Sequence, residues 1–233
     1  MSPGAFLKSK LAGALPRELD PILCASIGRV ASTRVAQTLV RERSKAIFGF
    51  SRYVSRRFIR KPAWDLKGVR FRPGAVYKTH DFPYDLIAPP RLKIIFLYGR
   101  PSDSILSLLR CCESKGPAWM ERHFAHMHAD GGYRELLHRD VLRIGEQIEA
   151  WSAVRNASVL GIRYTALWDK IDVLNGFVGF RVRLPPRIER NFMDINPAIV
   201  AIVRENYREL DMKEAGLPDC FLSSQTLARA GRP

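Results

Sequence analysis

Lys78 and His80 are two residues apart at the end of the apolar stretch 75–79, so an extended strand would place both side chains on one face. Imidazole titrates near neutral pH, and His80 is therefore suited to take the proton of an attacking hydroxyl. The Lys78 ammonium can neutralise charge that develops on a leaving oxygen. This pair predicts a group-transfer site, although a surface lysine and a histidine that caps a turn are the plainer interpretation.

A second candidate is the loop at residues 27–34, which follows the short apolar run 21–26. Its small residues let backbone N–H groups approach a phosphate, and a helix that starts there adds a favourable dipole. Ser32 and Thr33 add hydroxyl donors, and Arg29 adds a full charge. The Walker pattern is absent, which argues against an ordinary P-loop kinase or ATPase. The alternative is a strand-to-helix turn capped by Ser32.

The elements that must hold these residues alternate between strands and helices. Apolar runs predict strands at 21–26, 75–79, 93–98 and 158–163. Apolar periodicity predicts helices at 33–43, 140–154, 166–177 and 197–210. A further helix is predicted to start at Ser102, which would be its N-cap. This alternation predicts a three-layer α/β/α fold with a central parallel sheet. Ligands bind beyond the carboxyl ends of such strands, where residues 27–34, 78–83 and 99–107 are expected.

Length and composition favour one domain over residues 1–233, since 46% of them are hydrophobic. The formal net charge of +15 predicts an anionic partner. Eleven Lys and Arg lie between residues 41 and 72, against Glu42 and Asp65 only, as either a solvated face or an anion-binding surface. Four cysteines without a C-x-x-C pair, no secretory leader and no membrane-spanning run predict free thiols in a cytoplasmic protein.

Both candidate motifs resemble those of the sulfotransferases that use 3′-phosphoadenosine 5′-phosphosulfate. The stretch Arg29-Val30-Ala31-Ser32-Thr33 resembles the family's R/K-x-G-[ST]-T loop, with Ala31 in place of the usual glycine. The stretch from Lys78 to Pro83 resembles the K-T-H-x-P signature of cytosolic members. The resemblance implies a P-loop NTPase-like sulfotransferase fold, and it implies that His80 is the base and Lys78 assists. Asp81 is the alternative base, because glycan sulfotransferases often use a carboxylate.

Two further stretches extend the resemblance. Pro101, Asp103 and Ser107 fit the family's 3′-phosphate segment, but its arginine stands one place late, at Arg100. Tyr164 matches the tyrosine near the nucleotide, without the acidic pair that usually follows. The implied catalytic residues are His80, Lys78 and Arg29. The implied residues for the co-substrate are Arg29, Val30, Ala31, Ser32, Thr33, Arg34, Arg100, Ser107 and Tyr164.

The expected activity is transfer of a sulfuryl group to a hydroxyl or amine of a small-molecule, glycan or lipid acceptor. No metal is expected, because fixed cations can meet the single charge of a sulfuryl group. His123, His126 and His128 lack a suitably placed acidic ligand and are interpreted as surface or substrate-side residues. Trp119 is interpreted as packing or as part of an acceptor pocket. The alternatives are a basic nucleic-acid-binding module, which the two motifs disfavour, and an inactive nucleotide-binding relative.

Overall fold

The computed structural model describes residues 19–49 and 53–223. Their centre is a six-stranded sheet with the order β2-β3-β1-β4-β5-β6, in which β6 alone runs antiparallel to its neighbour. The strands are β1 (Ile22–Ser26), β2 (Arg60–Pro62), β3 (Val76–Lys78), β4 (Lys93–Tyr98), β5 (Ser158–Arg163) and β6 (Cys220–Ser223). The sheet is therefore mostly parallel, as the alternation of strands and helices predicted.

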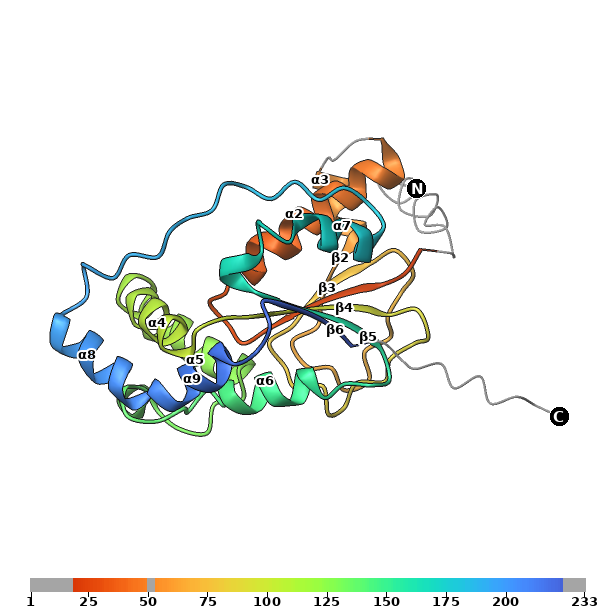
Figure 1. The fold of residues 1–233 in the computed structure, drawn as a ribbon. Helices are drawn as coiled ribbons and strands as arrows, with labels where there is room; N and C mark the ends of the chain where they lie inside the picture. Colours follow the sequence, from red (N-terminus) through yellow and green to blue (C-terminus); the bar gives the residue numbers. More distant parts are fainter. Residues whose placement is uncertain (1–18, 50–52, 224–233) are drawn as a thin grey trace.

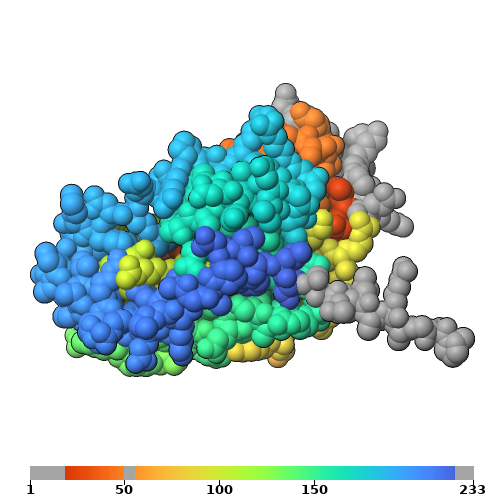
Figure 2. All heavy atoms as spheres, in the orientation of Figure 1, coloured from red at the N-terminus to blue at the C-terminus, as the bar shows by residue number. Residues whose placement is uncertain are grey.

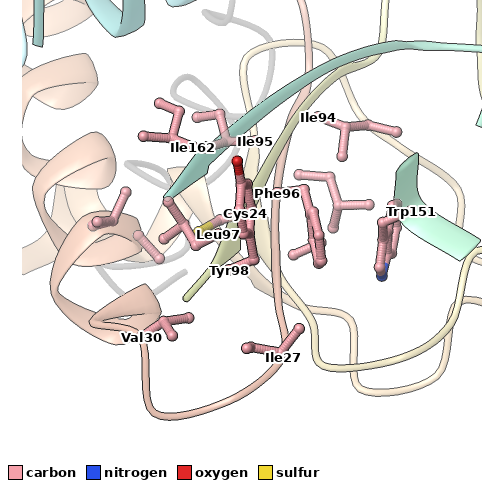
Figure 3. Packing of buried hydrophobic residues seen from close by; sticks show 14 of the residues in the cluster. Cys24, Ile27, Val30, Ile94, Ile95, Phe96, Leu97, Tyr98, Trp151 and Ile162 are labelled. Atoms are coloured by element: carbon pink, nitrogen blue, oxygen red, sulfur yellow. The ribbon is translucent and has the colours of Figure 1, made fainter. Parts of the chain in front are cut away.

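The inner strands are buried on both faces, which explains their continuous apolar sequences. All five residues of β1 are buried, and so are the last five of β4. Figure 3 shows Phe96, Tyr98 and Trp151 in this core, with Ile27 and Val30 of the loop after β1 at its edge. This packing holds the start of the candidate site against the sheet.

Helices cover both faces of the sheet (Figure 1). α2, α3 and α7 lie over one face, and α4, α5, α6, α8 and α9 lie over the other. The helices are α2 (Ser32–Phe48), α3 (Tyr53–Ile59), α4 (Pro101–Lys115), α5 (Pro117–His126), α6 (Ile144–Ser152), α7 (Ile171–Val178), α8 (Pro197–Asn206) and α9 (Arg208–Ala215). Short 3₁₀ turns occur at η1 (Tyr133–Leu137) and η2 (Tyr164–Ala166). The predicted α/β class with helices on both faces is confirmed.

The four predicted strands are confirmed within two residues at each end, whereas the helices differ more. α2 continues five residues past its predicted end, and the helix predicted at 197–210 is divided into α8 and α9. Ser102 is not the N-cap of α4, since the helix already begins at Pro101 and Arg100 holds the cap position. The short elements α3, β2, α5 and β6 were not predicted.

The strand order reverses at β1, and this reversal fixes where a ligand can enter. After β1 the chain forms β2 and β3 on one side of it, and it then crosses to β4 on the other. The crevice beyond the carboxyl end of β1 is the ligand position expected for such a sheet.

No helix among residues 19–49 and 53–223 is long and apolar enough to cross a membrane.

One long connection without regular secondary structure shapes the outer wall of this crevice. Residues 181–192 carry the chain from α7 on one face to α8 on the other. The space-filling view shows this light blue segment and the darker C-terminal helices along one side, with yellow-green atoms visible in a hollow between them (Figure 2).

Candidate functional site

A cleft of about 600 Å³ lies across the carboxyl ends of β3, β1, β4 and β5. It receives side chains from the loop after β1, the end of β3, helices α4 and α5, the turn after β5, and segment 181–192. Nine predicted site residues line it: Arg29, Ala31, Ser32, Thr33, Arg34, Lys78, His80, Ser107 and Tyr164. Residues far apart in the chain thus meet in one place.

The cleft is strongly cationic. Seven Lys or Arg side chains line it, against Glu189 as its one carboxylate. Arg110 pairs with Asp194, and Arg190 lies 3.8 Å from Asp103. The other five form no ion pair with any residue that the structure describes: Arg29, Arg34, Lys78, Lys115 and Arg122. A concave surface with unpaired cations attracts anionic ligands.

The loop after β1 has a backbone suited to anions. Gly28, Arg29 and Ala31 all have positive φ, at 83°, 55° and 59°. Such angles strain residues other than glycine, and strain of this kind collects at functional sites. Ala31 is the N-cap of α2 and offers no side-chain hydrogen bond, so the alternative interpretation, a turn capped by Ser32, is wrong. The first N–H groups of α2 therefore have no intrahelical partner and border the cleft.

Arg29, in the loop after β1, forms hydrogen bonds with two other parts of the cleft. Its Nε donates to Ser107 Oγ in α4 at 3.2 Å. Its backbone carbonyl accepts from the guanidinium of Arg190 in segment 181–192. Val30, the next residue, is fully buried in the core, so its side chain does not reach the cleft.

Lys78 and His80 are in direct contact, as their spacing predicted. Lys78 Nζ lies 2.7 Å from His80 Nε2, and His80 Nδ1 lies 3.0 Å from the carbonyl oxygen of Ser26. A carbonyl can only accept, so Nδ1 carries the proton and Nε2 keeps its lone pair for Lys78. Burial lowers the pKa of His80 well below its ordinary value, and the positive charge of Lys78 lowers it further. His80 is therefore a neutral imidazole whose Nε2 accepts a hydrogen bond from Lys78.

The same burial acts on Lys78. Desolvation lowers the pKa of its ammonium to about 8, and Arg60 and Arg29 contribute in the same direction. A lysine in this state carries its charge at neutral pH but releases a proton far more readily than an exposed one.

Asp81 does not fit the role of alternative base. Its Oδ2 accepts from the backbone N–H of Leu66 at 2.7 Å, and its Oδ1 accepts from that of Phe82 at 2.8 Å. His128 Nε2 lies 2.7 Å from the same Oδ1. Asp81 is buried and does not line the cleft, so its carboxylate holds neighbouring backbone rather than facing a substrate.

Arg100 is also placed elsewhere. It lies in a second hollow of about 480 Å³ and pairs with Asp211 of α9, with Nε and Oδ2 at 2.8 Å. Asp211 in addition accepts from the backbone N–H of Ser102 at 3.0 Å, at the N-terminus of α4. Arg100 thus pairs with a side-chain carboxylate and does not line the main cleft. Arg163 and Arg204 in this hollow are paired with Glu214 and Asp103 as well.

Around Tyr164, aromatic and cationic side chains form what we call the Tyr164 end of the cleft. The Tyr164 hydroxyl donates to the carbonyl of Ile188 at 2.9 Å, and the Arg190 guanidinium lies 4.4 Å from its ring centroid. Trp168 meets the Tyr164 ring edge-on at 5.6 Å. Arg110 lies 5.6 Å from the ring of Phe192. Among the residues that contact or surround Tyr164 here, Arg110 could have been predicted from its spacing, because it follows Ser107 by three residues on one helix.

Around His80, a second group of rings forms the His80 end. Trp64 stacks on His126 at 4.4 Å and lies 5.0 Å from Lys78 Nζ. Trp119 stacks on His123 at 4.9 Å, and the His123 ring lies 5.8 Å from that of His80. Burial lowers the pKa of His123 to about 4, and it lowers that of His126 as well.

Trp64 and the two cations Lys115 and Arg122 were not foreseen in this cleft, since loop and helix-surface positions carry no recognisable motif. Among residues 19–49 and 53–223, no group of three His, Cys, Asp or Glu side chains is arranged to hold a metal ion.

A scan against protein-family models finds no match for the chain. A search of curated proteins likewise finds no matching sequence.

Proposed function

We propose that the protein is a sulfotransferase that moves a sulfuryl group from 3′-phosphoadenosine 5′-phosphosulfate to an acceptor hydroxyl or amine. The finer assignment to a P-loop-like sulfotransferase fold is part of this proposal. It is supported by a strained loop after the central strand β1 that leads directly into the uncapped N-terminus of α2.

The observation that carries the proposal is the meeting of three separate sequence motifs in one cationic cleft. The loop at Arg29, the Lys78–His80 pair and Ser107 all line it, and Arg29 and Ser107 are in contact. The donor carries a 5′-phosphosulfate and a 3′-phosphate, so it needs several cations that are not already neutralised. The cleft offers five of these among the described residues, and the Tyr164 end offers rings for a base.

The proposed chemistry is an in-line displacement at sulfur. The acceptor oxygen forms a bond to sulfur while the bond from sulfur to the 5′-phosphate oxygen breaks, and 3′-phosphoadenosine 5′-phosphate leaves. The acceptor proton passes to Nε2 of His80. Because Lys78 occupies this nitrogen in the structure, an arriving hydroxyl takes its place, and Lys78 is freed to meet the leaving phosphate oxygen.

Fixed cations supply the charge that this transfer requires. A sulfuryl group carries one negative charge where a terminal phosphoryl group carries nearly two. Arg29 and Lys78 border the position expected for the group, and neither is paired with a carboxylate among the described residues. We therefore propose that the activity does not depend on an added divalent cation, and that EDTA leaves the rate of transfer unchanged.

Binding of the donor product tests the proposal first. 3′-Phosphoadenosine 5′-phosphate at about 100 times its Kd should stabilise the fold by about 2.7 kcal/mol and raise the melting temperature. Adenosine, which has no phosphates, is the matched control ligand and should give little shift. Arg29→Gln should reduce the shift, whereas Arg134→Gln removes an exposed cation outside the cleft and should not. A folded protein without any shift at millimolar ligand contradicts the proposal.

One observation favours a second candidate, a nucleotide-binding relative that does not catalyse transfer. Arg100, which the resemblance assigns to the 3′-phosphate, is engaged by Asp211. Sulfate-labelled donor separates the two, because an inactive relative binds the donor and releases neither labelled product nor free nucleotide. The nucleic-acid alternative is less favoured, since Arg43 of the basic segment is buried and Arg41 and Lys45 share Glu42.

A further inference from the structure

The His80 end of the cleft carries two positive charges that the donor is not expected to bind. Lys115 at the end of α4 and Arg122 in α5 both line the cleft there and are exposed. Neither forms an ion pair within residues 19–49 and 53–223. Lys115 Nζ lies 4.8 Å from the ring centroid of Trp119, which fixes its charge above the stacked pair of Trp119 and His123.

These two cations are separate from those expected to hold the donor. Arg29, Ser107 and the first turn of α2 surround the centre of the cleft, and Arg110 and Arg190 belong to the Tyr164 end. Ser107 and Lys115 are eight residues apart on α4, which corresponds to about 12 Å along a helix. Lys115 and Arg122 therefore lie on the side from which an acceptor reaches His80.

No side chain at this end balances the two charges. Glu189, the cleft's one carboxylate among the described residues, adjoins Ile188 and Arg190 at the Tyr164 end. The nearby His123 and His126 are held neutral by burial, so they add hydrogen-bonding atoms rather than charge. Nε2 of His123 is buried and has no hydrogen-bond partner among the described residues.

Trp64 and Trp119 add flat apolar surface beside these charges. Each is already stacked on a histidine, so the two ring pairs present walls rather than loose side chains. Trp64 reaches the cleft from the loop before β3, and Trp119 reaches it from α5. A hydroxyl between these ring pairs would approach Nε2 of His80 and replace Lys78 there, next to the cations of α4 and α5.

We infer that the acceptor is itself an anion, a hydroxyl compound whose carboxylate, sulfate or phosphate group is bound by Lys115 and Arg122. This inference rests on the proposed function and narrows its substrate class. It also disfavours amine acceptors, because an ammonium group would meet two cations and no carboxylate at this end. The hydroxyl oxygen is sulfated, and the acidic group stays unchanged and serves only for binding.

Acceptors that differ only in charge test the inference. The 4-hydroxyphenyl derivatives 4-hydroxyphenylacetate, its neutral amide and the cationic amine tyramine share one ring and one hydroxyl. Among sugars, methyl glucuronide and its neutral amide share one ring and the same three hydroxyls. We expect kcat/KM for labelled sulfate transfer to be about five- to tenfold higher for each acid than for its neutral partner, with tyramine lowest. Added salt should shrink this preference.

Variants show whether the preference comes from the two cations. The double variant Lys115→Gln and Arg122→Gln should lower kcat/KM for the acids to the neutral level, while the affinity for 3′-phosphoadenosine 5′-phosphate changes much less. Arg134→Gln is the control, since it removes one exposed charge outside the cleft and should keep the preference. Direct titration of the nucleotide-saturated protein with each acid and its neutral partner gives the same comparison without turnover.

The outcomes separate the inference from the proposed function. Nucleotide binding without a preference for the acids, in either transfer or titration, overturns the anionic acceptor and leaves the donor site standing. A preference that survives in the double variant overturns the assignment to Lys115 and Arg122. Absence of nucleotide binding contradicts the proposed function itself.

Discussion

The contact between Lys78 Nζ and His80 Nε2 makes two pH-sensitive groups depend on each other. Lys78 has a pKa lowered to about 8, so it loses its charge as the pH rises through that value. We expect kcat/KM, which reports the free enzyme, to fall above about pH 8. Lys78→Arg keeps the charge and should move this fall to higher pH.

Lys115→Arg is the control for this prediction, because it makes the same chemical change elsewhere in the cleft. The fall near pH 8 should persist in that variant. A profile that is flat to pH 10 in the parent would show that Lys78 charge does not limit the reaction.

His80 should determine the rate of transfer rather than the binding of nucleotide. A positioned general base contributes about 10²–10⁴-fold, so His80→Ala should lower kcat by that order and leave nucleotide affinity nearly unchanged. A lowered pKa also means that His80 is protonated only in acid. The acidic limb of the parent should therefore lie well below the ordinary imidazole pKa, and it should disappear in His80→Ala. A limb near pH 6.5, as a solvated histidine gives, would contradict the observed burial.

Asp81 should matter for stability more than for chemistry. Asp81→Asn leaves one atom that cannot accept, while two backbone N–H groups and His128 depend on the carboxylate. Loss of one buried acceptor costs about 1–3 kcal/mol, which should lower the melting temperature measured by calorimetry. The kcat of the folded variant should stay close to that of the parent. A loss of kcat at unchanged melting temperature would restore Asp81 as a base candidate.

Single site residues were predictable from the sequence where the contacts that place them are local, and not where their partners are distant in the chain. Lys78 and His80 were paired from their spacing alone, because an extended strand dictates which side chains share a face. The position of Arg100 was not predictable, since its partner Asp211 is 111 residues away. Trp64 and Arg122 were missed for the same reason, because only tertiary contacts bring them to His80.

At the scale of elements, the loop after β1 stores a conformational cost that can be measured. Ala31 has φ of 59°, and a left-handed angle costs a residue with a Cβ about 1–2 kcal/mol relative to glycine. Ala31→Gly should therefore raise the free energy of unfolding, by about 0.5–1 kcal/mol after the entropy of the unfolded chain is counted. Chemical denaturation measures this directly.

Ala201→Gly is the matched control, because Ala201 is exposed within helix α8. Glycine in a helix interior costs up to about 1 kcal/mol, so this variant should be less stable than the parent. If both variants lose stability equally, the left-handed angle at Ala31 carries no strain.

Elements were predictable where their sequence alone identified their environment. β1, β4 and β5 are apolar runs buried on both faces, and each was found within one residue. β6 has four residues, none fully buried, and it depends on pairing with β5, so its sequence has no such signal. The start of α4 was misassigned because the N–H of Ser102 donates to Asp211, a partner 109 residues away that local sequence does not reveal.

At the scale of the whole molecule, the net charge of +15 should strengthen nucleotide binding, because seven Lys or Arg side chains line the cleft. We expect the Kd of 3′-phosphoadenosine 5′-phosphate to rise with sodium chloride between 50 mM and 500 mM, because salt screens exposed charges. Arg34→Gln should weaken this dependence, whereas Arg208→Gln removes an equal charge that lies outside the main cleft and should not. A Kd independent of salt would mean that hydrogen bonds rather than charges hold the nucleotide.

The hydrogen bond from Arg190 to the carbonyl of Arg29 joins two segments of the chain that are 161 residues apart. A ribosome makes the loop, Lys78 and His80 long before it makes the wall that closes the cleft. A nascent chain that ends before residue 181 has no Ile188, Arg190 or Phe192, and β5 still lacks its partner strand β6. On the proposed function, nucleotide binding should therefore require a chain that extends through residues 181–192, and stalled chains of increasing length should show it as a threshold.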